Sequence, residues 1–268
     1  MNMPEKPVIK TARKTRILEV LRSKRLTPSM QRVTLGGSDL SDFPAGQEGN
    51  YIKLMIPPAG TSMAEFRTAL ENGNKNAPRR TYTVRHHRPA DNELDVDFVV
   101  HEGGGPACNW ALAAQSGDCV GVGGPGPIKF PDHKAKWFLF GADMSALPAA
   151  AAALENLPKN AVGHAVFEIT CEDDIQEVNA PEGIEIHWLI HDHPHTSSTQ
   201  QLDFFKALTW PDATPGVFVA GEFSAVAGLR TYLLNEKGLD KRSIYVSSYW
   251  KIGLVEDQHR VAKNAVPQ

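Results

Sequence analysis

The hydrophobic pattern of the chain changes near residue 131, and this change constrains the fold more than any other feature. Before it, short segments alternate apolar and polar residues, as in Leu94-Asp95-Val96-Asp97-Phe98. Such alternation is typical of strands with one buried face. After it, continuous apolar runs such as Lys136–Gly141 are typical of buried parallel strands. The change predicts two domains with different sheets.

Residues 1–131 are predicted to form a small barrel. Six segments have the length and alternation of strands and are separated by turns with glycine and proline. They are Thr15–Leu26, Met30–Leu35, Asn50–Ile56, Arg79–His87, Glu93–His101 and Cys119–Gly123. One helix is expected at Ala107–Ala114 and a shorter one at Ala64–Leu70. We therefore predict a six-stranded antiparallel Greek-key β-barrel.

Residues 132–268 are predicted to form a Rossmann-like parallel α/β domain of the kind that binds NAD(P)H. The expected strands are Lys136–Gly141, His164–Thr170, Glu185–Ile190, Gly216–Ala220 and Ser243–Ser247. The expected helices are Ser145–Asn156, Thr199–Leu208 and Ser224–Glu236. Because strand and helix alternate along the chain, the sheet should be parallel and covered on both faces.

Composition and charge argue against several classes of protein. The formal net charge is −3, so we expect no nucleic-acid partner. No apolar run approaches the roughly 20 residues needed to span a bilayer, so we do not expect the chain to be embedded in a membrane. The cysteines, Cys108, Cys119 and Cys171, form no Cys-x-x-Cys pair, which argues against an iron–sulfur cluster and a disulfide framework. We expect a monomer in a reducing cytoplasm.

The tetrapeptide Arg80-Thr81-Tyr82-Thr83 indicates the chemistry. Alternate side chains of a strand point the same way, so Arg80 and Tyr82 should share one face. The guanidinium of Arg80 is a planar fork that matches two phosphate oxygens. The ring of Tyr82 is suited to an isoalloxazine or a ribityl chain, and Thr83 to the flavin N5 edge. A planar ring attached to a pyrophosphate describes a flavin dinucleotide.

A glycine-rich turn supplies a second predicted phosphate contact. Gly103-Gly104-Gly105 leads into the helix that should start near Ala107. Glycine allows close approach of the main chain to a ligand, and the first N–H groups of a helix point at bound anions. A barrel with these groups, followed by an α/β domain, is the order of flavin reductases that take hydride from a nicotinamide.

Motifs spread over nearly the whole chain resemble one known family. The chain is similar to the siderophore-interacting proteins, the ferric-siderophore reductases of the ferredoxin–NADP reductase superfamily. The segments that carry the resemblance are Arg80–Arg85, His101–Trp110, Gly117–Gly126, Phe140–Ala149, Ala220–Glu222 and Tyr249–Asp257. The chain departs from the family pattern at Met144-Ser145, where an acidic residue and threonine are common, and at Cys108, where a small hydroxyl residue is common.

The resemblance implies an FAD-dependent reductase of ferric siderophores that acts in the cytoplasm and releases ferrous iron. A flavin takes up electrons in pairs and releases them singly, which suits ferric iron as the acceptor. No catalytic residue beyond the flavin is then required. The predicted cofactor-binding residues are Arg80, Thr81, Tyr82, Thr83, Val99, His101, Gly104, Gly105, Pro106, Ala107, Cys108 and Trp250.

The resemblance also implies a basic pocket for the substrate. Many ferric siderophores are anionic, and the family's basic pocket residues fall at places similar to Lys53 and Lys129. We predict that these two lysines bind substrate, with Arg85 as a third candidate. An exposed lysine in ordinary contact with solvent is the alternative for each.

The electron donor is predicted to bind the α/β domain. The expected donor-binding residues are Asp143, Ser145, Ala146, Glu172, Gly221 and Glu222. Residues 171–192 contain seven acidic residues and no Lys or Arg. A 2′-phosphate favours a basic site, whereas a carboxylate suits a free ribose 2′-hydroxyl. We therefore predict NADH over NADPH, with reduced ferredoxin as a competing donor.

A run of histidines, His187, His191, His193 and His195, is the other conspicuous pattern. Alternate histidines can bind a metal, but the run contains Pro194 and follows a strand, so we predict a loop and no metal site. Two other functions remain open. One is a general flavin reductase that serves ferredoxin or flavodoxin, and the other is a siderophore-binding carrier without turnover.

Overall fold

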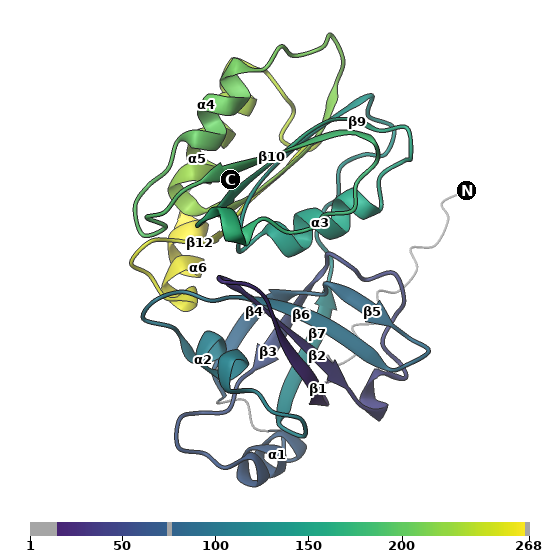
Figure 1. Cartoon of the computed structure of the whole chain (residues 1–268), viewed down its shortest axis with the longest axis vertical. Helices are drawn as coiled ribbons and strands as arrows, with labels where there is room; N and C mark the ends of the chain where they lie inside the picture. The colour runs from purple at the N-terminus through teal and green to yellow at the C-terminus, as the bar shows by residue number, and fades with distance from the viewer. Residues whose placement is uncertain (1–14, 74–76, 266–268) are drawn as a thin grey trace, which may run out of the picture.

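The chain builds two sheets, one above the other in Figure 1. The computed structural model describes residues 15–73 and 77–265. Residues 1–14 and 266–268, which the predicted domains include, lie outside this part, as do residues 74–76. The predicted fold class is confirmed, because an antiparallel sheet is followed by a parallel α/β sheet. The predicted boundary at residue 131 lies in the link between the two sheets.

The first sheet has seven strands, one more than predicted. Their order across the sheet is β4-β3-β7-β1-β2-β6-β5. The strands are β1 (Thr15–Thr27), β2 (Met30–Gly36), β3 (Tyr51–Met55), β4 (Arg79–Thr83), β5 (His86–Arg88), β6 (Glu93–Val99) and β7 (Cys119–Gly126). Two helices, α1 (Met63–Glu71) and α2 (Pro106–Ala113), and a short 3-10 turn, η1 (Ser38–Leu40), lie in the connections.

The extra strand arises because the predicted strand Arg79–His87 is split in two. Val84 still donates its N–H to Asn50, next to β3, at 2.9 Å, whereas Arg85 donates to Asp95 of β6, also at 2.9 Å. The chain therefore changes its hydrogen-bonding neighbour between these two residues. Since β4 and β5 lie at opposite edges of the sheet, this crossing brings the edges together and closes the barrel.

The alternation in β6 separates a core face from a charged face. Leu94, Val96 and Phe98 are fully buried in the barrel core. Asp95 and Asp97 point to the other face but are also buried, because arginines cover them. Burial acts to raise the pKa of Asp95, yet hydrogen bonds from Arg88, His86 and Thr34 hold it far below its ordinary value.

The second sheet is parallel, with the order β10-β9-β8-β11-β12. Its strands are β8 (Trp137–Asp143), β9 (Val162–Ile169), β10 (Gly183–Ile190), β11 (Pro215–Glu222) and β12 (Tyr245–Trp250). Its helices are α3 (Leu147–Glu155), α4 (Gln200–Ala207), α5 (Phe223–Thr231) and α6 (Glu256–Ala265), with a 3-10 turn, η2 (Glu172–Asp174), and a π-helical turn, η3 (Tyr232–Glu236). None of the helices within residues 15–73 and 77–265 is long and apolar enough to cross a membrane.

Alternate residues of each central strand enter different cores. In β8, Phe138 and Phe140 pack with the alanines of α3, whereas Leu139 packs with Phe205 of α4 and Leu229 of α5. The continuous apolar pattern of the sequence is explained by this burial on both faces.

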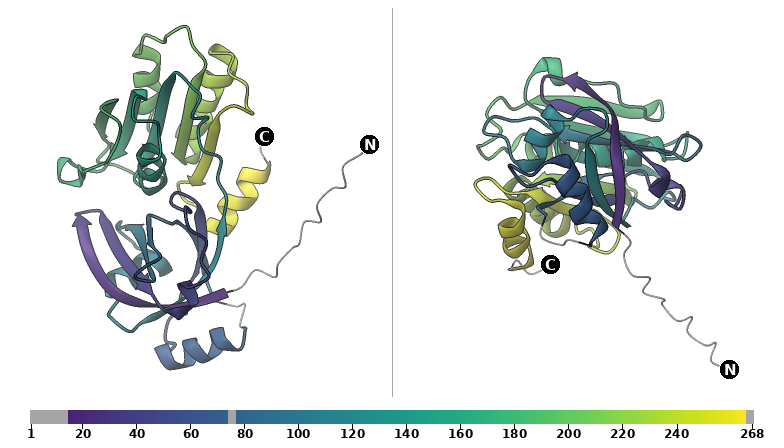
Figure 2. Two further views of the ribbon diagram at one scale, coloured as in Figure 1. Left: turned by 90° about the vertical axis from the view of Figure 1, so that its right-hand side faces the viewer. Right: turned by 90° about the horizontal axis from the view of Figure 1, so that it is seen from below.

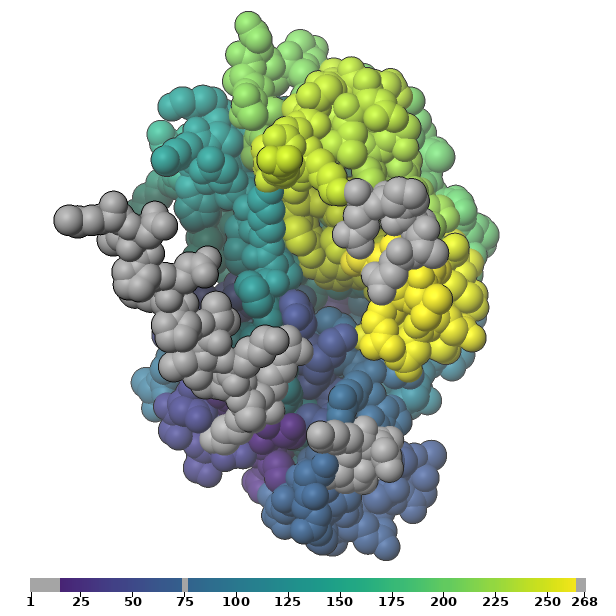
Figure 3. All heavy atoms as spheres, turned by 180° about the vertical axis from the view of Figure 1, so that it is seen from behind, coloured from purple at the N-terminus to yellow at the C-terminus, as the bar shows by residue number. Residues whose placement is uncertain are grey.

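The C-terminal segment differs most from the prediction. The predicted strand Ser243–Ser247 is shifted, because β12 begins at Tyr245 and includes Tyr249 and Trp250, and α6 was not predicted. In Figures 1 and 2, α6 leaves the sheet and lies between the two domains. Figure 3 shows the same relationship from behind, with the yellow C-terminal residues beside the blue residues of the barrel.

Buried polar contacts fix the two domains to one another. Asp174 is fully buried, and its Oδ1 accepts hydrogen bonds from the hydroxyl of Thr27 and the N–H of Ser29, both at 2.8 Å. Arg85 forms a two-pronged ion pair with Glu155 of α3, at 2.7 and 3.1 Å. These contacts hold the carboxyl ends of β8–β12 above the barrel.

Candidate functional site

A cavity of about 1630 Å³ lies between the barrel and the carboxyl end of the parallel sheet. Pockets for single small molecules usually measure about 300–1,000 Å³, so this one has room for a dinucleotide and a second ligand. Ligands of open α/β sheets bind at this edge because the strands end there and the loops diverge.

All four residues of the tetrapeptide on β4 line the cavity: Arg80, Thr81, Tyr82 and Thr83. The ring of Tyr82 packs on Phe98, with 4.3 Å between ring centroids, and Phe98 in turn contacts Trp110. Burial raises the pKa of Tyr82, so its phenol remains a neutral hydrogen-bonding group. This stack holds one wall of the cavity in a fixed position.

The glycine turn and α2 form the neighbouring wall. Gly105 is the N-cap of α2 and Pro106 begins its first turn, where a proline loses no helical hydrogen bond. The predicted cofactor residues of this region that line the cavity are Val99, His101, Gly105, Pro106, Ala107 and Cys108. Gly104 does not line it, but its φ of +52° forms the turn. The start of α2, where N–H groups have no acceptor within the helix, therefore faces the cavity.

The three predicted substrate residues lie in different surroundings. Lys53 and Lys129 line the cavity. Arg85 does not, because the chain crosses to β6 there and the side chain is buried in its ion pair with Glu155. We therefore do not retain Arg85 as a substrate candidate.

On the α/β side, Asp143 organises the loop that leads into α3. Its Oδ1 accepts hydrogen bonds from the N–H groups of Ser145 and Ala146, at 2.9 and 3.2 Å. Its Oδ2 accepts the indole N–H of Trp250 at 2.7 Å. Asp143, Ser145 and Trp250 line the cavity, and Ala146 lies behind them. Burial raises the pKa of Asp143 against the effect of these hydrogen bonds.

Gly221 supports this arrangement from the adjacent strand without lining the cavity. Its φ is +148°, and a Cβ at this position would lie 2.7 Å from the carboxylate of Asp143. No other residue fits this position without strain, since L side chains rarely adopt such a backbone.

Two predicted donor residues have other contacts. Glu222 lines the cavity, but its Oε2 caps α5 by accepting the N–H groups of Ser224 and Ala225, and its Oε1 accepts that of Ile252. Glu172 is exposed in η2 and does not line the cavity. The strand before it ends at Ile169, so η2 carries Glu172 away from the cavity.

Comparisons with known proteins agree with this geometry. The model of the siderophore-interacting FAD-binding domain matches residues 19–128, and the model named siderophore-interacting protein matches residues 135–253. The ferric vibriobactin reductase of Vibrio cholerae is 35% identical over 94% of each chain. The chain belongs to the siderophore-interacting protein family. The family resemblance expected from the sequence motifs is therefore confirmed, and residues 19–128 form an FAD-binding domain.

A further relative is a named reductase, and another has a solved structure. The NADPH-dependent ferric-chelate reductase of Escherichia coli is 30% identical over 88% of this chain and 92% of that protein. The crystal structure of the siderophore-interacting protein SipS from Aeromonas hydrophila has 28% identity and a TM-score of 0.83 over 94% of this chain and 97% of that one.

The contribution of α6 to the cavity was not predicted from the sequence. Glu256, His259 and Lys263 all line it. His259 Nε2 lies 3.0 Å from Ser248 Oγ, and Lys263 donates to Ser247 Oγ and to the carbonyl of Ser248 at 2.7 and 2.8 Å. The helix has few apolar residues, so it lacks the apolar segment by which the other helices were predicted. Acidic residues at its start and a lysine near its end were the available signal.

The four histidines of the conspicuous run do not form one cluster. His191, His193 and His195 line the cavity on the loop after β10. His187 lies within β10 and contacts His164 and Glu185, neither of which belongs to the run.

Proposed function

We propose that this protein is an FAD-dependent reductase of ferric siderophores that releases iron as Fe²⁺. The observation that carries the proposal is the cavity in which the FAD-binding domain meets the α/β domain, lined by Arg80 and Tyr82 from one and Asp143 from the other. The relatives named ferric vibriobactin reductase and NADPH-dependent ferric-chelate reductase support the same reaction class.

The residues of the cavity fit FAD. Arg80 offers a guanidinium fork and the start of α2 offers N–H groups for the pyrophosphate. Tyr82, held on Phe98, offers a ring for the flavin or its ribityl chain. A bound flavin accepts an electron pair as hydride and passes electrons on singly, which joins a two-electron donor to ferric iron. The protein positions the flavin and supplies the charged groups around it.

Lys53 and Lys129 are proposed to hold the siderophore. Both line the cavity, and both carry a positive charge that attracts an anionic iron chelate. Lys53 lies beside Thr81 of the cofactor strand, to whose hydroxyl it donates a hydrogen bond. A chelate bound there would therefore lie next to the proposed flavin site.

The donor is proposed to be NADH, because the segment 171–192 is acidic. Residues 171–192 contain no Lys or Arg that would hold a 2′-phosphate. Glu172 lies outside the cavity, so its carboxylate is not expected to bind the donor ribose. The name of one relative, an NADPH-dependent ferric-chelate reductase, favours NADPH. A side-by-side anaerobic titration with NADH, NADPH and reduced ferredoxin identifies the donor, and faster flavin bleaching by NADPH overturns the choice of NADH.

We also propose that the protein works in a reducing compartment as a monomer. All three of its cysteines are free, and two of them are buried, which suits a cytoplasmic setting. Size-exclusion chromatography with light scattering tests the monomer, and cell fractionation tests the location.

The central experiment is anaerobic. The flavin of the purified protein is reduced, a ferric siderophore is added, and reoxidation is followed by flavin absorbance together with a ferrous-iron trap. We expect reoxidation with one class of siderophore among catecholate, hydroxamate and carboxylate chelates. Absence of flavin in the protein, or failure of all three classes to reoxidise it, would defeat the proposal.

A further inference from the structure

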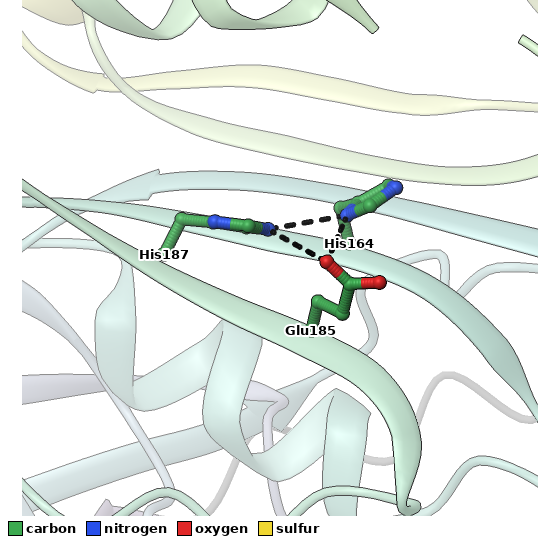
Figure 4. Close-up of side chains that lie close together, drawn as sticks. All are labelled: His164, Glu185 and His187. Carbon is green, nitrogen blue, oxygen red and sulfur yellow. Dashed lines mark hydrogen bonds and ion pairs between the residues drawn. The ribbon is translucent and has the colours of Figure 1, made fainter. Parts of the chain in front are cut away.

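Two histidines and a glutamate meet on one face of the parallel sheet, away from the cavity. His164 lies on β9, and Glu185 and His187 lie on the edge strand β10 (Figure 4). Glu185 is paired with His164 in the register of the two strands, and His187 is two residues further along the same strand. All three side chains therefore project from the face that α4 covers.

The distances among their ligand atoms suit a metal ion. His164 Nδ1 lies 3.1 Å from His187 Nε2, and Glu185 Oε2 lies 3.7 Å from the first and 3.8 Å from the second. For these separations, the point equidistant from the three atoms lies about 2.1 Å from each of them. Zn–N and Zn–O bonds measure about 2.0–2.2 Å. An ion at this point would replace the hydrogen bond that joins the two imidazole nitrogens.

The surroundings hold the two rings in place. Phe204 of α4 contacts His187, with 4.5 Å between centroids, and His164 at 6.4 Å. Trp137 lies edge-on to His164. The carboxylate of Glu185 is 70% exposed, so ions can enter from solvent.

We propose that His164, Glu185 and His187 form a binding site for one divalent first-row transition-metal ion. Two imidazoles and a carboxylate are a donor set shared by Zn²⁺ and non-haem Fe²⁺ sites, and three protein ligands leave coordination positions open. The histidine run led us to predict no metal site. The proposed site contains only one residue of that run, His187.

This site is separate from the proposed reductase cavity. None of its three residues lines the cavity, whereas Glu168 of the same strand does. His164 lies four residues before Glu168, or about 13 Å along a strand. Metal binding and flavin chemistry can therefore be tested independently.

The test is metal binding to the FAD-loaded full chain after treatment with chelator. Zn²⁺, anaerobic Fe²⁺ and Mg²⁺ are titrated by calorimetry, and bound metal is counted by mass spectrometry after gel filtration. We expect one Zn²⁺ per chain, weaker binding of Fe²⁺ as the usual order of divalent ions requires, and no binding of Mg²⁺. Bound Zn²⁺ should also raise Tm, because it binds only the folded state.

Variants assign the ion to these residues. His164→Ala, His187→Ala and Glu185→Gln should each weaken Zn²⁺ binding more than about tenfold, the loss that even an outer-shell partner can cause. The matched control is His133→Ala, an exposed histidine elsewhere on the α/β side of the chain, which should bind as the parent does. Unchanged flavin content and circular dichroism verify folding of each variant.

Three results would overturn the proposal: no saturable Zn²⁺ binding, equal binding of Mg²⁺, or Zn²⁺ affinity unchanged in the three variants. X-ray absorption at the zinc edge provides a direct check, because it should report two imidazoles and one carboxylate oxygen. A zinc shell with only water and carboxylate ligands would contradict the assignment.

Discussion

Glu256 of α6 and Lys53 of β3 form an ion pair across the domain boundary, with 3.0 Å between Oε1 and Nζ although 203 residues separate them. The other carboxylate oxygen of Glu256 accepts the N–H of Thr81 at 3.0 Å. Burial acts to raise the pKa of Glu256, but hydrogen bonds from Thr81 and the charge of Lys53 hold it below its ordinary value. At neutral pH the carboxylate is therefore charged, and it neutralises the lysine that we propose for substrate.

Glu256→Gln should therefore strengthen the binding of an anionic ferric siderophore. The amide can still accept the hydrogen bond from Thr81, whereas Lys53 loses its competing partner. Because the Lys53 side chain is 42% exposed, the pair contributes only about 0.5–1 kcal/mol, and KM should fall about two- to fivefold in the ferrous-trap assay. Glu71→Gln is the control, since Glu71 is an exposed residue of α1 and does not line the cavity. An equal fall in both variants would point to net charge and not to Lys53.

Arg80→Lys should weaken FAD binding. Lysine keeps the positive charge but loses the two-pronged geometry that matches a pyrophosphate, so the dissociation constant should rise about tenfold, the effect of about 1.4 kcal/mol. The measurement is flavin fluorescence during titration of the apoprotein with FAD. Arg79→Lys serves as the matched control, because Arg79 is the exposed neighbour on the same strand and does not line the cavity. Tight FAD binding by Arg80→Lys would remove Arg80 from the pyrophosphate site.

Gly221→Ala should destabilise the α/β domain and displace Asp143. The added Cβ would meet the Asp143 carboxylate at 2.7 Å on a backbone with φ of +148°, and such positions cost about 1–3 kcal/mol. Urea unfolding measures the loss, and quenching of tryptophan fluorescence reports on the Trp250 contact with Asp143. Gly37→Ala separates the two effects, since Gly37 has φ of +141° but no atom closer than 3.7 Å to an added Cβ. If both substitutions cost the same, the clash with Asp143 has no energetic effect.

Asp95 should make the barrel sensitive to acid. Its folded-state pKa lies below its ordinary value, so its stabilising contribution is complete above the unfolded-state pKa and is lost as the pH falls through the folded-state pKa. The free energy of unfolding should be level near neutral pH and should fall between about pH 5 and pH 2. Asp95→Asn should cost about 3 kcal/mol at pH 7, the lower end for a broken buried ion pair, because Arg88 keeps Glu93 as a partner, and it should flatten this fall. The exposed Asp91, on the turn between β5 and β6, provides the control Asp91→Asn, which should leave the slope unchanged.

Much of the fold was predictable because local patterns agree with the tertiary structure. The alternation of β6 and the apolar run of β8 each reflect which faces are buried, and burial is a property that the sequence records residue by residue. The tetrapeptide on β4 was also found from the sequence alone, since its residues are neighbours in the chain and all of them line the cavity.

Contacts between distant segments were not predictable in the same way. Arg85 lies two residues after the end of the cavity-lining strand, yet it faces Glu155, because the chain crosses to β6 at that point. Glu222 has the sequence position of a ligand-binding residue, yet both of its oxygens accept backbone N–H groups. These contacts of Arg85 and Glu222 do not depend on a local propensity, so no pattern in the sequence predicts them.

By itself, the sequence determined the two sheets, the cavity-lining tetrapeptide on β4 and the family to which the chain belongs, because each depends on residues close together in the chain or on an ordered set of short motifs. Only the tertiary structure decided that Glu256 meets Lys53, that Trp250 donates to Asp143, and that His187 joins His164 and Glu185 in place of the other histidines of its run. These pairings depend on strand register, domain packing and the path of α6. Such features follow from the free energy of the whole fold and not from the residues of any one segment.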